Sequence, residues 1–172
     1  MVILIAGSSH TGKTLLAQKL LEKYNYTYLS IDHLKMGLIR SGNTSLTVCD
    51  DKELTPYLWD IVKEIIKVNI ENNQNIIIEG CYIPFDWKKY FDDIYLKEIK
   101  YVCLILSEEY IHKNFDEIKS YENIIEKRKE HENIDPEELI RENNYNLKMC
   151  EEYKNKYVLI KDKYNINIDD LM

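Results

Sequence analysis

Two glycines and a Lys-Thr pair near the start of the chain have the spacing of a loop that binds phosphate. They are Gly7, Gly12, Lys13 and Thr14, and they stand between an apolar run and residues with helical spacing. Glycine permits backbone conformations that bring amide groups close to an anion. At a helix N-terminus those amides and the helix dipole favour negative charge. The pattern predicts a P-loop whose nucleotide-binding residues are Gly7, Ser8, Ser9, His10, Thr11, Gly12, Lys13 and Thr14.

The Lys-Thr pair gives this loop its expected chemistry. Lys13 supplies a positive charge for the β- and γ-phosphates of ATP, and the Thr14 hydroxyl suits Mg²⁺. We therefore expect Lys13 to be catalytic and Thr14 to be a metal ligand, while His10 contributes only its backbone. A plain strand-to-helix turn is the alternative interpretation of the same residues.

Five apolar runs predict the strands that position this loop. Residues 2–6 are entirely apolar and rich in β-branched side chains, as in strands buried on both faces. Similar runs follow at 26–31, 76–80, 101–106 and 157–160. The stretches between these runs have helical patterns. This alternation predicts a three-layer α/β fold with a parallel sheet, in a single domain that spans residues 1–172.

The helix starts are predicted from capping residues. The first helix is expected at 13–24, directly after the loop. Asp32 is the expected N-cap after the second strand. A long helix is expected from Thr55, with Pro56 in its first turn. Asp135, followed by Pro136, is the expected N-cap of a helix that continues to about residue 153.

Residues 112–135 are dense in charge and poor in large apolar side chains. One interpretation of this segment is a solvated helical excursion. The other is a mobile lid whose cations reach a bound ligand and which excludes water from a reaction.

The succession of these features resembles the small P-loop kinases, the family that includes adenylate kinase, shikimate kinase, gluconate kinase and chloramphenicol phosphotransferase. The features are the loop after the first strand, an acidic residue after the second, Glu79-Gly80 after the third and a charged segment after the fourth. The resemblance implies a P-loop NTPase fold with a five-stranded sheet of order 2-3-1-4-5 and a helical lid at 112–135.

The same resemblance implies roles for residues outside the loop. Glu79 holds the position of a carboxylate that meets Mg²⁺, with a structural strand-end Glu as the alternative. Asp32 corresponds to a residue that contacts the substrate hydroxyl and accepts its proton, although Asp is also a good N-cap. Lys35 and Arg40, on the same expected helix, are either substrate-binding or surface residues. Arg128 in the lid is the candidate for stabilising charge in the transition state.

Trp87 follows the third strand, at a position that faces the acceptor pocket in this fold. An aromatic side chain there is either part of the core or a wall of the pocket.

Composition narrows the expected partners. The formal net charge of −7 argues against nucleic acid, because neutralising phosphates requires clustered Lys and Arg. No run approaches the roughly 18 apolar residues of a membrane span, and the first residues lack the basic segment of a signal peptide. The four cysteines form no CxxC pair and are expected to be free thiols. We expect a cytoplasmic protein that uses Mg²⁺, ATP and a small-molecule acceptor, without a nucleic-acid or membrane partner.

The predicted function is that of an ATP-dependent phosphotransferase, a kinase that acts on a small-molecule acceptor through its hydroxyl or phosphate group. One alternative is a nucleoside or nucleotide kinase of the adenylate kinase type, although Lys35 is a poorer bidentate partner for phosphate than Arg. A second alternative is a non-catalytic ATP-binding module, which would keep the loop and lose the acceptor-side groups. Convergence of Asp32, Lys35 and Glu79 beside the loop would distinguish a kinase from such a module.

Overall fold

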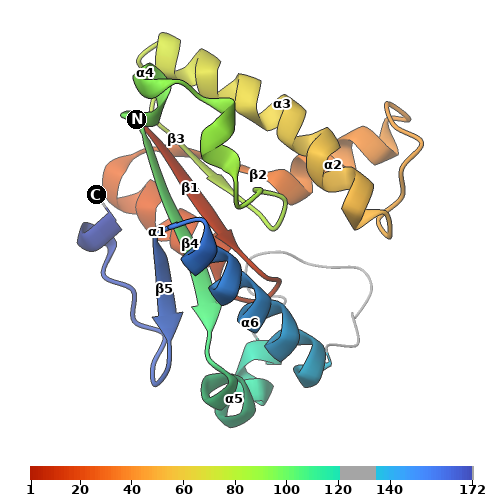
Figure 1. Cartoon of the computed structure of the whole chain (residues 1–172), viewed down its shortest axis with the longest axis vertical. Helices are drawn as coiled ribbons and strands as arrows, with labels where there is room; N and C mark the ends of the chain where they lie inside the picture. Colours follow the sequence, from red (N-terminus) through yellow and green to blue (C-terminus); the bar gives the residue numbers. More distant parts are fainter. Residues whose placement is uncertain (121–134, 172) are drawn as a thin grey trace.

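Five parallel strands form one sheet with the order β2-β3-β1-β4-β5 (Figure 1). The computed structural model describes residues 1–120 and 135–171. The order and the parallel orientation confirm the prediction. The strands are β1 (Val2–Gly7), β2 (Thr27–Ser30), β3 (Ile76–Glu79), β4 (Ile99–Leu106) and β5 (Tyr157–Ile160).

Helices fill the connections between the strands. α1 begins at Lys13 as predicted, and Asp135 caps α6, because its carboxylate accepts a hydrogen bond from the Glu137 backbone N–H at 3.1 Å. The helices are α1 (Lys13–Tyr24), α2 (Ile31–Arg40), α3 (Asp51–Glu71), α4 (Asp93–Leu96), α5 (Glu108–Ser120) and α6 (Pro136–Glu152), with short 3₁₀ turns η1 (Trp87–Tyr90) and η3 (Ile168–Leu171).

Two helix starts differ from the prediction. Ser30 is the N-cap residue of α2, so Asp32 lies in the first turn of that helix instead of capping it. α3 begins at Asp51, one turn before Thr55, and Pro56 therefore lies inside the helix. The additional turn buries Leu54 completely and lets the Thr55 hydroxyl donate to the Asp51 carbonyl at 2.9 Å. Tertiary packing has here outweighed the local signal of the Thr-Pro pair.

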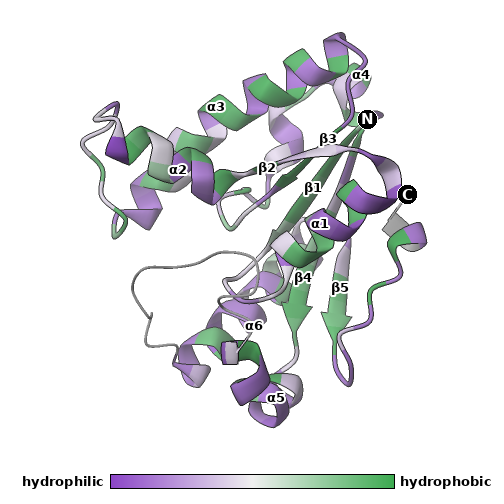
Figure 2. Cartoon of the chain, turned by 180° about the vertical axis from the view of Figure 1, so that it is seen from behind, coloured by the Kyte–Doolittle hydropathy of each residue, from purple (hydrophilic) through white to green (hydrophobic). Residues whose placement is uncertain are grey.

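Residues of β1 alternate between the two faces of the sheet. Val2, Leu4 and Ala6 belong to the apolar cluster that includes α3, whereas Ile3 and Ile5 pack with the buried side chains of α1. Figures 1 and 2 show the two faces, with α3 and α6 in front of the sheet in the first view and α1 in front in the second. The central strands β1 and β4 are hydrophobic over most of their length in Figure 2, as expected of strands covered on both faces. The predicted three layers are confirmed.

The residues that follow β3 and β4 complete the core. Trp87 is buried and stacks on Tyr101 with 5.6 Å between ring centroids, and its indole N–H donates to Asn155 Oδ1 at 3.2 Å. Trp87 is therefore a core residue. All four cysteines are free; Cys103 and Cys150 are buried, whereas Cys49 and Cys81 are exposed.

The strand register brings three connections to one edge of the sheet. Ile5 pairs with Glu79, and Glu79 pairs with Ser30. The loop after β1, the start of α2 and the segment after β3 therefore begin side by side at the carboxyl ends of adjacent strands. This edge of an open parallel sheet is where ligands commonly bind.

Candidate active site

The loop between β1 and α1 has, at Gly7 and Gly12, a backbone conformation that only glycine adopts easily. Gly7 and Gly12 have φ values of +143° and +79°. A Cβ atom added at Gly7 would lie 2.6 Å from the Leu104 carbonyl oxygen, and one at Gly12 would lie 2.4 Å from the Tyr164 hydroxyl oxygen. His10 also has a positive φ, 61°, which is uncommon for a residue other than glycine. The two glycines are required by both conformation and space.

Side chains inside the loop stabilise this shape. The Thr11 hydroxyl donates to the Ser8 carbonyl at 2.9 Å, and the Lys13 ammonium donates to the same oxygen at 2.7 Å. Ser8, Thr11 and Lys13 are all buried. The ammonium thus points back into the loop. From the resemblance to small P-loop kinases, we expect the nucleotide phosphates at this place.

Two residues from the C-terminal third of the chain hold the loop from outside. The Asn146 amide on α6 donates to the Ser8 hydroxyl at 2.8 Å. The Tyr164 hydroxyl, in the segment after β5, donates to the Gly12 carbonyl at 2.9 Å. Burial raises the pKa of Tyr164 well above its ordinary value, so the phenol stays protonated and keeps donating. The loop is therefore supported at both ends.

Lys13 lies among groups that favour its charged form. Burial by itself would lower the pKa of Lys13, but Cys81, Glu79 and Asp32 act in the opposite direction, and the net result is a raised pKa. Lys13 is therefore a permanent cation with two carboxylates in its electrostatic range.

Thr14 and Glu79, the two predicted metal ligands, lie side by side. The Thr14 hydroxyl donates to Glu79 Oε1 at 3.3 Å, and Glu79 is almost completely buried. A hydroxyl and a carboxylate at this separation are the kind of oxygen donors that Mg²⁺ takes from proteins, with water and phosphate oxygens as its other ligands. The described residues contain no cluster of three or more His, Cys, Asp or Glu side chains suited to a metal ion.

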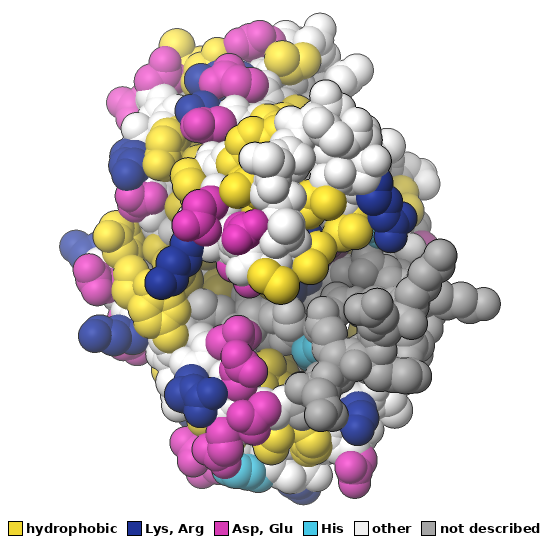
Figure 3. Space-filling model, turned by 90° about the vertical axis from the view of Figure 1, so that its right-hand side faces the viewer, with side chains coloured by type: hydrophobic (Ala, Val, Ile, Leu, Met, Phe, Trp, Pro, Cys, Tyr) yellow, Lys and Arg dark blue, Asp and Glu magenta, His cyan; other side chains and the backbone are white. Residues whose placement is uncertain are grey.

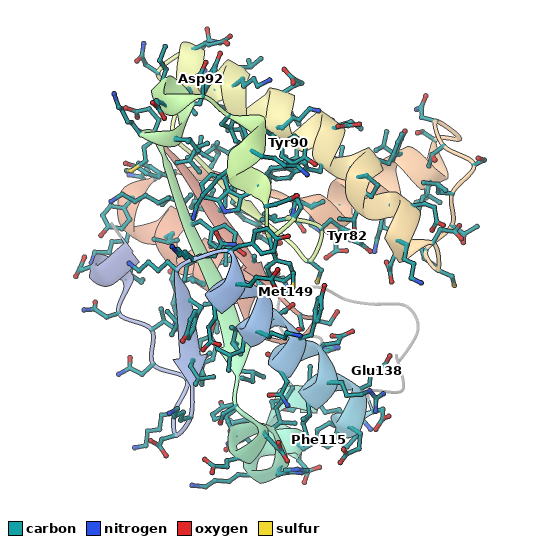
Figure 4. All side chains as sticks on the ribbon, in the orientation of Figure 1. Tyr82, Tyr90, Asp92, Phe115, Glu138 and Met149 are labelled. Atoms are coloured by element: carbon teal, nitrogen blue, oxygen red, sulfur yellow. The ribbon has the colours of Figure 1, made fainter. Side chains whose placement is uncertain are left out.

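Asp32 and Lys35 form an ion pair on α2, with 3.0 Å between the Asp32 carboxylate and the Lys35 ammonium. Lys35 also donates to the Tyr82 hydroxyl at 2.8 Å, and that hydroxyl donates to Asp51 Oδ1 at 2.7 Å. Figure 4 shows Tyr82 between the sheet and the start of α3. A continuous polar network thus connects α2, the segment after β3 and α3.

The structure brings most of the predicted site residues together. Asp32 and Glu79 both act on Lys13, and Lys35 joins this group through Asp32. Arg40 is exposed in the last turn of α2, eight residues after Asp32, which corresponds to about 12 Å along a helix. Arg128 lies outside the described residues.

The expected lid at 112–135 is described only in its first residues. Residues 112–120 belong to α5, which packs through Ile111 and Ile118 against Leu139 and Ile140 of α6. The rest of the segment, up to residue 134, lies outside the described residues.

Five residues of the site carry no motif and were missed by sequence reasoning. Cys81 and Tyr82 directly follow Glu79-Gly80, so their position after a buried strand was a usable signal. Asp51, Asn146 and Tyr164 gave no such signal, because only the packing of α3, α6 and the segment after β5 brings them to the loop.

Within the described part of the chain, every helix is too short or too polar to cross a lipid bilayer.

No family model matches this chain, and no curated protein matches its sequence. Solved structures do match its fold. A sugar kinase from Janibacter sp. HTCC2649 superposes with a TM-score of 0.55 at 14% identity, over 99% of this chain and 88% of that one. A shikimate kinase from Acinetobacter baumannii gives 0.52 at 14% identity, over 99% and 87%. A shikimate kinase from Bacteroides thetaiotaomicron gives 0.51 at 16% identity, over 99% and 93%.

These likenesses extend over nearly the whole chain. Because the sequence identities are so low, they establish the fold alone. The fold is that of the small P-loop kinases, with the strand order found here.

Proposed function

We propose that this protein is an ATP-dependent phosphotransferase that transfers the γ-phosphoryl group of ATP to a small-molecule acceptor. The observation that carries the proposal is the placement of two carboxylates at the end of the sheet beside the loop: Glu79 accepts from the Thr14 hydroxyl at 3.3 Å, and Asp32 lies in the first turn of α2, directly after the strand whose Ser30 pairs with Glu79. A module that only binds ATP has no need of an acceptor-side carboxylate at this position. The kinases among the structures of the same fold support the proposal.

The loop performs the nucleotide-binding part of the reaction. The backbone amides of residues 8–14 surround the β- and γ-phosphates, and Lys13 gives up its bond to the Ser8 carbonyl to contact them. Thr14 and Glu79 would hold Mg²⁺, which would supply charge neutralisation at the phosphates. Because Lys13 is already positioned by a buried loop, little reorganisation is needed when phosphate charge develops.

Asp32 performs the acceptor-side part. The acceptor hydroxyl donates a hydrogen bond to the Asp32 carboxylate, and its oxygen attacks the γ-phosphorus. The bond from that phosphorus to the β–γ bridging oxygen breaks, ADP leaves, and the hydroxyl proton passes to Asp32. Arg128 of the lid is proposed to stabilise the charge on the migrating phosphoryl group.

The test is a search for the phosphorylated product. Purified protein is incubated with Mg-ATP and fractionated metabolite extracts, and products that carry label from the γ-phosphate are identified by mass spectrometry. We expect labelled acceptor and stoichiometric ADP from the native protein, and neither from Lys13→Ala. Binding of Mg-ATP without product from any fraction would instead indicate an ATP-binding module, and absence of ATP binding would overturn the proposal altogether.

A further inference from the structure

The ammonium of Lys35 is already engaged by groups of this chain. Its side chain is only 13% exposed, and it contacts the Asp32 carboxylate at 3.0 Å and the Tyr82 hydroxyl at 2.8 Å. The ammonium also lies 4.9 Å from the centre of the Tyr82 ring, which is a cation–π distance. Two of the three N–H donors of Lys35 are thus used within the protein, and the ammonium also lies against the Tyr82 ring.

Tyr82 connects Lys35 to a second carboxylate. The tyrosine is buried, and its hydroxyl donates to Asp51 Oδ1 at 2.7 Å while it accepts from Lys35. Burial, and then the bond to Asp51, raise the pKa of Tyr82 far above its ordinary value, so the phenol keeps its proton. Asp51 in turn lies in the first turn of α3, where the helix dipole favours a negative charge.

The network therefore carries two carboxylates and one ammonium, a net charge of −1. Carboxylates of α6 lie within electrostatic range of the same region. Partial desolvation raises the pKa of Glu142, and repulsion from Glu138 and Asp51 adds to the effect, while Lys13 and Arg141 act in the opposite direction without cancelling it. Figure 4 shows Glu138 on α6 and Tyr82 near α3, and Figure 3 shows acidic side chains on both halves of this face of the molecule.

A negatively charged acceptor fits this arrangement poorly. A carboxylate or phosphate bound through the remaining donor of Lys35 would lie beside the Asp32 carboxylate, with Asp51 nearby, and like charges brought together in this way are costly. Recognition of such anions usually relies on the bidentate guanidinium of Arg. Arg40 and Arg141 are both exposed, and Arg40 lies five residues, about one and a half turns of α2, beyond Lys35.

We propose that Asp51 and Tyr82 determine acceptor specificity by keeping Lys35 paired within the protein, so that the acceptor is an alcohol without negative charge. Neutral polyols and amino alcohols fit this description, whereas hydroxy acids and sugar phosphates do not. In this role Lys35 positions the Asp32 carboxylate and does not anchor an anion. The inference rests on the proposed phosphotransferase function and specifies its substrate class.

The experiment compares acceptors that match in size and differ in charge. Polyols, amino alcohols, hydroxy acids and sugar phosphates with the same number of carbons are assayed with Mg-ATP, and kcat/KM is determined for each. We expect the best polyol or amino alcohol to exceed its acidic counterpart by about tenfold or more, the factor that corresponds to about 1.4 kcal/mol. Preferential phosphorylation of acids or phosphates would overturn this inference and leave the proposed function intact. Absence of product from every class would overturn both.

Two variants test the residues themselves. Tyr82→Phe removes the link between Lys35 and Asp51, and Asp51→Asn removes one negative charge with little change in shape. Each is expected to raise the ratio of kcat/KM for a hydroxy acid over that for the matched polyol by about tenfold. A merely structural role would lower both values together and leave the ratio unchanged, which would overturn the assignment of Tyr82 and Asp51.

A matched control for these variants is available on the surface of α3. Asp60 forms an exposed ion pair with Lys63 at the same i, i+3 spacing as Asp32 and Lys35. Asp60→Asn is expected to leave the ratio unchanged. A ratio altered to the same extent in this variant would show that net charge alone, and not the network at Lys35, controls the preference, and would overturn the proposal.

Discussion

The phosphate side and the acceptor side of this site are built in different ways. The phosphate side consists of eight consecutive residues whose shape is set by backbone conformation at Gly7 and Gly12. The acceptor side is a set of side chains from α2, α3 and the segment after β3, and the Lys35–Tyr82 bond joins positions 47 residues apart. In the proposed function, phosphate would be bound mainly by a local structure, whereas the acceptor side exists only once separate elements have packed.

This difference has a consequence for specificity. A backbone loop offers the same amides to any nucleotide, so in the proposed function it would define the class of reaction. The network of Asp32, Lys35, Tyr82 and Asp51 has charges and shapes particular to this chain, and we propose that it determines which acceptor enters. Variants on the two sides should therefore separate ATP binding from acceptor use.

The largest effect is expected from Lys13→Ala. Removing the buried ammonium removes the charge that faces the transferred phosphoryl group, and phosphoryl transfer should fall by about 10³-fold or more. Steady-state kinetics with γ-labelled ATP measures the loss. Lys67→Ala, which removes a lysine from a surface pair on α3, is the control and should retain full activity.

Asp32→Asn should separate the two sides. The amide cannot accept the acceptor proton, so kcat should fall by about 10²-fold, while the affinity for Mg-ATP measured by calorimetry stays unchanged. Equal losses of ATP affinity and turnover would place Asp32 on the phosphate side and contradict the division made here.

Gly12→Ala should damage the phosphate side alone. The alanine would have to keep the positive φ of Gly12, and its Cβ would lie 2.4 Å from the Tyr164 hydroxyl oxygen. Strain of this kind costs about 1–3 kcal/mol, which corresponds to roughly a tenfold or greater loss of ATP affinity. Gly37→Ala is the matched control, because nothing lies within 4 Å of a Cβ there. Since Gly37 is inside α2, that substitution should stabilise the protein by about 0.5–1 kcal/mol.

A smaller effect is expected from Tyr164→Phe. The substitution removes the hydrogen bond to the Gly12 carbonyl and keeps the ring, so the protein should lose about 1 kcal/mol of stability and about 2–4 °C in Tm. Thermal unfolding with and without Mg-ATP measures the change. An unchanged Tm would mean that the loop keeps its shape without this support.

The smallest effect is expected from Glu142→Gln. The pKa of Glu142 is raised in the folded protein, so its ionised form disfavours folding, and this penalty is absent at pH values below the ordinary carboxyl pKa of about 4.3. The variant should therefore have a slightly higher Tm than the native protein at pH 7 and the same Tm near pH 4. Glu152→Gln, at the end of α6, should show no such pH-dependent gain.

The sequence by itself determined the class of fold and the phosphate side. Uninterrupted apolar runs predicted five buried strands, and the strand-loop-helix order around Gly7 and Gly12 predicted the loop, because both signals depend on residues adjacent in the chain. The start of α3 was missed, since burial of Leu54 extended the helix beyond its Thr-Pro signal.

Only the tertiary structure decided how the acceptor side is assembled. Asp32 and Lys35 could be named from the sequence, but their partners Tyr82 and Asp51 could not, because no local pattern records which side chains meet when α2 and α3 pack at the edge of the sheet. The same holds for Asn146 and Tyr164, which reach the loop from more than 130 residues away. Backbone conformation is encoded locally, whereas side-chain networks depend on contacts between distant segments, and this is why the two halves of the site differed in how far they could be predicted.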